Sequence, residues 1–455
     1  MRTSAVNSKY IFSQGKRFEG KFYLNENSFL SMEVERHGEK SQPLSNLATV
    51  FNPPVFKRQF CKPTLRSVPY FQSSDVPIAE ERSQTYVFKG QAEALNLLVQ
   101  RGDILVTGFG TIGNTRLVSK FQNGTCYANN VCRIRTNDGV FRGFIYAFLS
   151  SKFGVAQLNK NASGSVVRYI EAPGIKKTLV PNFSESFQKE VDDLIQESAR
   201  LREEATEALE EAKRLIIEFC NHPFSKSIGE NIGKISSSRL LHSLNARFDA
   251  PVFINDGVNW VKTLSKETVL LGDCNIRTWY PGMFKRSYVK NGYPYIKGSE
   301  LFLSDPFRKC EQLSRSRTPK LDELWLKEGQ LLLSCAGVCG LVKLITKEYD
   351  EKQAIGSPDI IRLVSDDSLF TKEYLFAYLQ IPAIYDYMQS LKYGSVIERF
   401  DISNIETIPV VKPTLELSQM VTEIVMKYAD CTYKGYKAEE KAISMVEKEI
   451  EKWNN

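Results

Sequence analysis

The feature of this sequence that most restricts its fold is an internal duplication. Four blocks recur in the same order and at nearly the same displacement along the chain: 17–25 with 247–255, 69–74 with 294–299, 101–106 with 328–333, and 164–167 with 394–397. The first block reads RFEGKFYLN in one half of the chain and RFDAPVFIN in the other. Agreement that preserves order rarely arises by chance, so we predict two copies of one structural unit.

A long helix is predicted at the end of each copy. Residues 184–221 contain no glycine or proline, and Ser184 is a suitable N-cap. Apolar residues alternate in steps of four and three, which is typical of a coiled-coil seam, and the same steps recur at the end of the second copy. The residues expected to pair the two helices are Val191, Leu194, Leu201, Leu215, Val421, Ile424, Tyr428 and Met445. A seam of about 33 residues makes a helix ~50 Å long, which favours helix pairing over packing on a single small domain.

The rest of each copy mixes short strands with helices. Strands are predicted at 103–107, 132–135 and 331–334, amphipathic helices at 144–158 and 374–388, and connectors at 222–240 and 262–282. We therefore predict an α+β fold, with two duplicated mixed α/β domains separated by two long antiparallel coiled-coil helices in a pseudo-twofold arrangement. The expected boundaries are 1–182 and 223–412 for the domains and 183–222 and 413–455 for the helices.

Composition argues against several other classes of protein. A chain of 455 residues is too long for one ordinary domain, and no window approaches 18 consecutive apolar residues. The nine cysteines are scattered and the three histidines are not spaced as zinc ligands, so no metal site is expected. The N-terminus lacks the apolar stretch of a secretory signal, which predicts a cytoplasmic protein.

Sequence motifs for catalysis are also incomplete. Residues 108–113 (GFGTIG) match a dinucleotide fingerprint, but the residues that follow favour a strand where the fingerprint needs a helix. A tight turn between two strands explains the glycines better. The chain has no phosphate-binding GxxxxGK[ST] motif, and Asn52-Pro-Pro-Val lacks the aromatic residue of an amino-methyltransferase signature. We therefore predict no catalytic residues and no cofactor in this chain.

Basic segments that contain aromatic residues are the best candidates for a binding function. They lie at 56–66, 284–290 and 307–320, and the chain has a net charge of +7. Lysine and arginine neutralise phosphates, and arginine and glutamine also pair with base edges. The predicted DNA-contacting residues are Lys57, Arg58, Gln59, Lys62, Arg66, Lys285, Arg286, Lys290, Arg308, Lys309, Arg315 and Arg317. For any one of these residues, an ordinary solvated loop is the alternative.

Together these features resemble the specificity subunits of type I restriction–modification systems. The resemblance is carried by Gly102-Asp-Ile-Leu-Val-Thr, Gly110-Thr-Ile-Gly, Gly164-Ser-Val-Val and the helix at 184–221, with openings at Arg17 and Arg247. It implies that each domain is a target-recognition domain reading half of a split DNA sequence, while the helices form a conserved spacer. It also implies a non-catalytic role in DNA methylation and phage defence, with two methyltransferase subunits and motor–nuclease subunits as partners. S-adenosylmethionine, ATP and Mg would then be bound by those partners.

Two other classes stay open on the sequence alone. One is a non-catalytic coiled-coil scaffold whose duplicated domains bind proteins, and the other is an enzyme of unknown type that uses tyrosine or acidic side chains. A steep loss of DNA binding with salt would favour the DNA reader over the scaffold.

Overall fold

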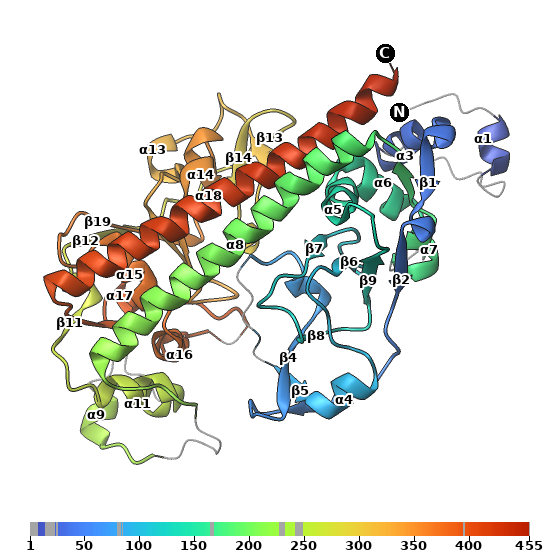
Figure 1. The fold of residues 1–455 in the computed structure, drawn as a ribbon. Helices are drawn as coiled ribbons and strands as arrows, with labels where there is room; N and C mark the ends of the chain where they lie inside the picture. Colours follow the sequence, from blue (N-terminus) through green and yellow to red (C-terminus); the bar gives the residue numbers. More distant parts are fainter. Residues whose placement is uncertain are drawn as a thin grey trace. The chain divides into compact units, whose positions relative to one another are not determined.

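The computed structural model describes residues 8–13, 23, 26–79, 83, 85–163, 168–226, 233–241, 249–394 and 396–454. It consists of two compact units, of which the first comprises residues 1–203 and 434–455 and the second residues 204–433. Each unit contains one domain and one half of each long helix, α8 (Glu185–Cys220) and α18 (Leu415–Glu451) (Figure 1). The repeated openings at Arg17 and Arg247 and the block 164–167 lie outside the described residues.

The domain of the first unit contains three small sheets. One is antiparallel, in the order β2 (Ala48–Phe51), β9 (Val131–Thr136), β6 (Ile104–Thr107), β7 (Thr115–Leu117). A second has the order β3 (Phe60–Cys61), β5 (Tyr86–Phe88), β4 (Ser67–Phe71), β8 (Cys126–Tyr127), and only its last pair is parallel. In the third, β1 (Ser41–Pro43) pairs antiparallel with β10 (Leu179–Pro181).

The second unit repeats these sheets strand for strand. Its antiparallel sheet has the order β12 (Ile276–Trp279), β19 (Ile360–Ser365), β16 (Leu331–Ser334), β17 (Val342–Leu344). Its second sheet has the order β13 (Tyr288–Val289), β15 (Glu311–Leu313), β14 (Tyr293–Ile296), β18 (Ile355–Gly356), again with only the last pair parallel. β11 (Thr268–Leu270) pairs antiparallel with β20 (Pro409–Val411). The predicted duplication of a mixed domain is therefore confirmed, and the structure adds that the two copies share the order and direction of their strands.

Short helices connect and cover these sheets. In the first unit they are α1 (Ser8–Ser13), α3 (Glu26–Arg36), α4 (Lys89–Ala94), α5 (Arg142–Ser150), α6 (Lys152–Lys160) and α7 (Ala172–Lys176), with 3-10 turns at Gly38–Lys40, Leu44–Asn46, Ser73–Asp75 and Lys452–Asn454. In the second they are α9 (Ser237–Leu241), α10 (Pro251–Ile254), α11 (Asp256–Lys262), α12 (Gly298–Leu301), α13 (Leu321–Leu324), α14 (Lys347–Glu351), α15 (Lys372–Leu379), α16 (Pro382–Leu391) and α17 (Ile402–Ile405), with a 3-10 turn at Leu271–Asp273.

Two details of the predicted secondary structure were wrong. Each predicted amphipathic helix is two helices, because Ser151 ends α5 and accepts a hydrogen bond from the Gly154 N–H, while Pro382 begins α16. The predicted connector at 262–282 contains β11 and β12, which have three and four residues and are too short to show an alternating pattern.

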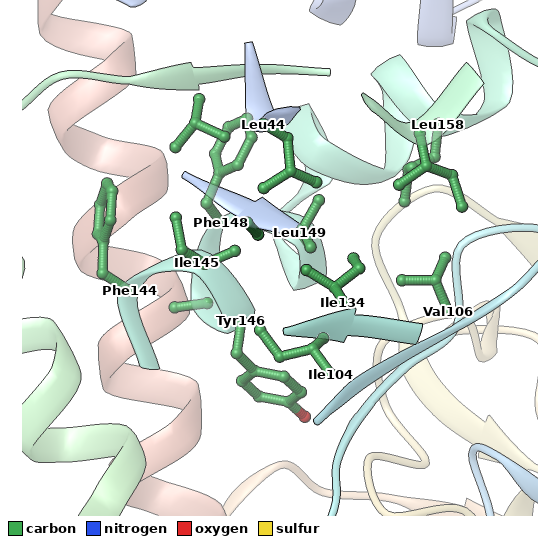
Figure 2. Close-up of a cluster of buried hydrophobic side chains, with 14 of the residues drawn as sticks. Leu44, Ile104, Val106, Ile134, Phe144, Ile145, Tyr146, Phe148, Leu149 and Leu158 are labelled. Carbon is green, nitrogen blue, oxygen red and sulfur yellow. The ribbon is translucent and has the colours of Figure 1, made fainter. Parts of the chain in front are cut away.

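The core of the first domain lies between α5 and the antiparallel sheet. Ile104 and Ile134 project from β6 and β9 toward Phe148 and Leu149 of α5, and all four side chains are fully buried (Figure 2). Parts of both long helices join the same cluster, including Val191 and Ile195 of α8 and Ala442, Val446 and Ile450 of α18. The helix halves are thus part of the hydrophobic core of the unit to which they belong.

The halves of α8 and α18 contact each other directly within each unit. In the first unit the two halves run antiparallel (Figure 1), and the Ser198 hydroxyl donates to the Gly435 carbonyl at 2.7 Å. In the second unit, Cys431 Sγ lies 3.9 Å from a carboxylate oxygen of Glu204. Ser184 caps α8 as predicted, because its Oγ accepts from the Phe187 N–H at 3.4 Å.

The residues predicted to pair the helices are not equally buried. Four of them are buried, namely Val191, Leu201, Val421 and Tyr428, and four are half-buried, namely Leu194, Leu215, Ile424 and Met445. Ile195, Ile216, Val425 and Val446, each one residue further along, are at most 2% exposed. The buried stripe is therefore wider than a two-position seam because each helix also packs against a domain.

The glycine-rich segment at 108–113 is a turn between two strands, as predicted. Gly110 and Gly113 have φ values of 71° and 84°, which only glycine adopts readily, and β7 begins two residues later. Gly337 and Gly340 take the same conformation in the second unit, with φ values of 73° and 88°. In the described part of the chain, no helix is both long enough and apolar enough to cross a membrane.

Candidate nucleic-acid interface

The basic segment of the first unit surrounds β3, which is the end strand of its sheet. All five residues predicted here are exposed: Lys57, Arg58, Gln59, Lys62 and Arg66. The carbonyl of Lys57 accepts from the Gln91 side chain at 3.2 Å, and the Lys89 N–H donates to the Arg66 carbonyl at 2.8 Å. The backbone of the segment is thus anchored to α4 and its start, while the basic side chains remain open to solvent.

The corresponding segment of the second unit surrounds β13, again an end strand. Lys285 and Lys290 are exposed, and Arg286 is half-buried. β15 pairs with β13, and the Ser314 N–H donates to the Ser287 carbonyl at 2.9 Å. This contact brings the segment that carries the exposed Arg315 and Arg317 to the middle of the basic segment at 284–290.

The other two predicted residues lie before β15. Arg308 is half-buried, and its Nε pairs with the Asp305 carboxylate at 3.2 Å. Because Asp305 already neutralises part of its charge, Arg308 is a weaker candidate for a phosphate contact. Lys309 is exposed.

One arginine of each basic segment lies over the ring of a buried tyrosine. The Arg58 guanidinium is 5.8 Å from the Tyr70 ring centroid, and the Arg286 guanidinium is 5.6 Å from that of Tyr295. Both tyrosines are only 1% exposed. Burial raises the pKa of Tyr70, and the Arg58 charge partly opposes that rise. We call these two contacts the arginine–tyrosine pairs.

No role was predicted for these tyrosines from the sequence, although the signal was present. Tyr70 and Tyr295 occupy the same position in one of the four repeated blocks. What the sequence could not show is that β4 and β14, which carry the tyrosines, pass beneath the basic segments.

A fully buried arginine in each unit supports the sheets beneath this surface. Arg133 of β9 donates to the carbonyls of Leu97, Tyr127 and Val131 at 2.7–2.9 Å and to Ala128 at 3.4 Å. Arg362 of β19 does the same with Gly356, Ile360, Ser357 and Leu324, at 2.8–3.5 Å. Burial lowers the pKa of each arginine to about 10, so both remain charged at neutral pH. In each unit this side chain ties one four-stranded sheet to the parallel edge of the other, where β8 or β18 ends.

Among the described residues, no group of three or more histidine, cysteine or acidic side chains is placed to hold a metal ion. The surface formed by the basic segments consists of arginine, lysine and aromatic side chains. Such a surface suits phosphates and bases.

Comparison with protein families gives one match, to the type I restriction modification DNA specificity domain, over residues 277–441. That range covers most of the second domain together with α18 up to residue 441. Over the matched residues the chain is similar to a type I DNA specificity domain. The first unit repeats the three sheets of the second in order and direction.

The description of the matched domain points to DNA recognition as the function of this part of the chain. Among solved structures, the type I restriction–modification S subunit from M. genitalium is 14% identical, with 90% of this chain and 94% of that chain covered and a TM-score of 0.34. The HsdS subunit from Thermoanaerobacter tengcongensis is 15% identical, with 90% and 95% covered and a TM-score of 0.28. A search of curated protein sequences gives no significant match.

Proposed function

We propose that this chain is the specificity subunit of a type I restriction–modification system and reads a split DNA target, with one domain for each half-site. The observation that carries the proposal is the matched position of the basic segments. In both units the segment surrounds the end strand of the same sheet and places an arginine over a buried tyrosine. Two copies of one reader in one chain are suited to two half-sites at a fixed spacing.

The two long helices are the part of the chain that we propose sets this spacing. The 36 residues of α8 make a helix about 54 Å long, which is the length of roughly 16 base pairs. Two half-sites that each bind weakly gain affinity when a stiff spacer links their readers. A pseudo-twofold arrangement of the two units stays a prediction of this proposal.

We also propose that the helices dock methyltransferase subunits, two in number because the chain has two equivalent units, and that motor–nuclease subunits join this complex. In this proposal S-adenosylmethionine, ATP and Mg are bound by the partner subunits, and the chain itself supplies recognition and assembly. The residues predicted from sequence to contact DNA remain predictions, and the solvent exposure of most of them supports the proposal.

The spacer proposal can be tested by lengthening both helices where the two units meet. We would insert four residues between Glu203 and Glu204 and four between Tyr433 and Lys434, because the unit boundary crosses each helix there. Each insertion adds about one helical turn, or roughly 6 Å, so the preferred gap should grow by about two base pairs. Both half-site sequences should stay the same, as measured by selection from random duplexes with the methyltransferase partner present.

A matched control places the same four residues after His222, beyond the end of α8. This control should leave the gap unchanged. If the helix insertions also leave it unchanged, the spacer proposal is wrong. If the chain and its partner bind no DNA in a salt titration, the protein-binding scaffold becomes the better explanation.

A further inference from the structure

The two basic segments share a sequence pattern as well as a position. Residues 56–60 read FKRQF and residues 284–288 read FKRSY, and the two segments fall at matching points of the duplication. Each pattern ends in the end strand of its sheet, at Phe60 in β3 and at Tyr288 in β13. The third residue of each pattern is the arginine of an arginine–tyrosine pair.

The rings around the first pair limit where its guanidinium can go. Phe56 and Phe60 both meet the Tyr70 ring edge-on, with centroids 6.3 and 5.6 Å away. These two residues flank Arg58 in sequence, so the segment that carries the arginine packs against the tyrosine on both sides of the arginine. In the second unit, Phe284 packs in one buried cluster with Tyr295.

The tyrosines use their ring faces and not their hydroxyl groups. Within the described part of the chain, the hydroxyl oxygens of Tyr70 and Tyr295 are buried and have no hydrogen-bond partner. A buried hydroxyl without a partner lowers stability, so a phenylalanine would be the simpler core residue. What both rings do offer is an electron-rich face that attracts a cation held within about 6 Å of the ring centroid.

A guanidinium held in this way suits a base better than a phosphate. Phosphate contacts tolerate movement, and the neighbouring Lys57 and Lys285 are exposed point charges able to make them. Reading a base requires a planar fork at a fixed angle, and the partner of an arginine fork in the major groove is the O6 and N7 edge of guanine. Holding the arginine in advance reduces the entropy lost on binding.

We propose that Arg58 and Arg286 each read a guanine, at equivalent positions of the two half-sites, and that Tyr70 and Tyr295 are positioning residues for these arginines. The inference rests on the proposed function, since it assigns the residues that recognise each half-site. It adds that the two half-sites are related in sequence at one position, because the two readers are related in structure there.

The test is selection of bound duplexes from a random pool, using the full chain with its methyltransferase partner. The wild type should select a split motif with a guanine at the matching place in each half. Arg58→Ala should lower the preference for one guanine about tenfold or more and leave the other half-site unchanged. Arg286→Ala should do the same to the other half-site only.

The positioning role of the tyrosine is tested with two variants, one that removes only the hydroxyl group and one that removes the whole ring. Tyr70→Phe keeps the ring and should retain the full preference for guanine. Tyr70→Leu removes the ring and should relax the same position as Arg58→Ala, while the double variant Arg58→Ala with Tyr70→Leu should lose no more than Arg58→Ala alone. If Tyr70→Leu does not fold, Arg58→Lys replaces it, because a lysine keeps the charge over the ring but has no fork, and the guanine preference should fall.

Lys177→Ala is the matched control for charge, because Lys177 is an exposed cation of the first unit that lies outside both the basic segments and the long helices. It should weaken binding slightly or not at all and leave every base preference intact. A split motif that survives both Arg58→Ala and Arg286→Ala would overturn the inference while leaving the split-target proposal standing. Losses that add in the double variant would show that Tyr70 acts on stability and not through Arg58. Absence of any split motif in the wild type would instead contradict the proposed function.

Discussion

The two units solve the same structural problems, in some places with the same residues and in others with different ones. The turn before the first central strand is an example of a difference. In the first unit Asp103 accepts from the Gln100 N–H at 2.9 Å and from the Arg135 side chain at 2.8 and 3.2 Å. In the second unit Gln330 accepts from the Lys327 N–H at 3.1 Å, and the strand position of Arg135 is occupied by Val364. The turn therefore needs a side chain that accepts a hydrogen bond at this position, and that side chain can be charged, as Asp103 is, or neutral, as Gln330 is.

The contact between each domain and its long helix differs in the same manner. Glu203 of α8 pairs with the Arg101 side chain at 2.9 Å and accepts from the Lys120 N–H at 2.7 Å. The equivalent residue of α18 is Tyr433, whose hydroxyl lies 2.5 Å from Glu351 and whose ring lies beneath Lys347. The same helix position is thus an acidic residue in one unit and a tyrosine in the other. The groups that this residue contacts in the domain also differ between the two units.

Arg133 and Arg362 show the opposite behaviour, since they are identical in the two units. Their acceptors are backbone carbonyls at equivalent positions. A carbonyl is present whatever the side chain, so no change in a partner can compensate for losing the arginine. We infer that side chains bonded to other side chains are free to change in pairs after duplication, whereas a buried side chain whose hydrogen bonds all go to backbone carbonyls is retained.

The largest effect expected from this comparison is on stability, in Arg133→Met. Methionine fills much of the volume, but four buried carbonyls lose their donor, and we expect a loss of about 3 kcal/mol or more. Hydrogen exchange should report faster opening of β8 and β9 and little change in β18 and β19. Arg362→Met should give the reverse pattern, and Lys177→Met, at an exposed site, should change neither unit. Equal destabilisation of both units by either variant would contradict the idea of one independent arginine support per unit.

The sequence predicted the parts of this molecule that depend on periodicity and repetition. The duplication, the strands at 103–107 and 331–334 and the turn at 108–113 all follow from patterns that are local in the chain. The long helices follow too, because Ser184 and the apolar steps after it mark a start and a face. The break at Ser151 was missed because a serine cap inside an apolar run has no effect on periodicity.

The features that sequence reasoning missed depend on contacts between distant segments. Arg133 was part of a predicted strand, but its role depends on carbonyls at Leu97 and Tyr127, which only the fold brings together. Tyr70 stood in a repeated block, yet the sequence shows neither its burial nor the guanidinium above it. The basic segments could be located because their charges are visible in the sequence, and their contact with DNA stays a prediction.

A smaller effect is expected at the turn that differs between the units. Asp103→Ala should cost about 2 kcal/mol, because both the Gln100 N–H and Arg135 lose their acceptor, whereas Gln330→Ala should cost about 1 kcal/mol. The double variant Asp103→Gln with Arg135→Val copies the second unit into the first. It should be more stable than Asp103→Ala when measured by chemical denaturation. If the double variant is the least stable of the three, the charged pair is needed in the first unit and the two turns are not interchangeable.

The smallest expected effect is the change in stability when a tyrosine is replaced by phenylalanine. It should differ between the tyrosines beneath the arginines and a tyrosine whose hydroxyl group makes a hydrogen bond. Tyr70→Phe and Tyr295→Phe remove buried hydroxyls that have no partner in the described part of the chain, so stability should stay level or rise by up to about 1 kcal/mol. Tyr374→Phe is the matched control, because this equally buried hydroxyl donates to the Val411 carbonyl at 2.8 Å, and its loss should cost about 1 kcal/mol. The sign of the change in denaturation midpoint is therefore the measurement that matters. A loss at Tyr70 as large as that at Tyr374 would mean that the hydroxyl has a partner, and the ring face would then no longer be the reason for a tyrosine at both positions.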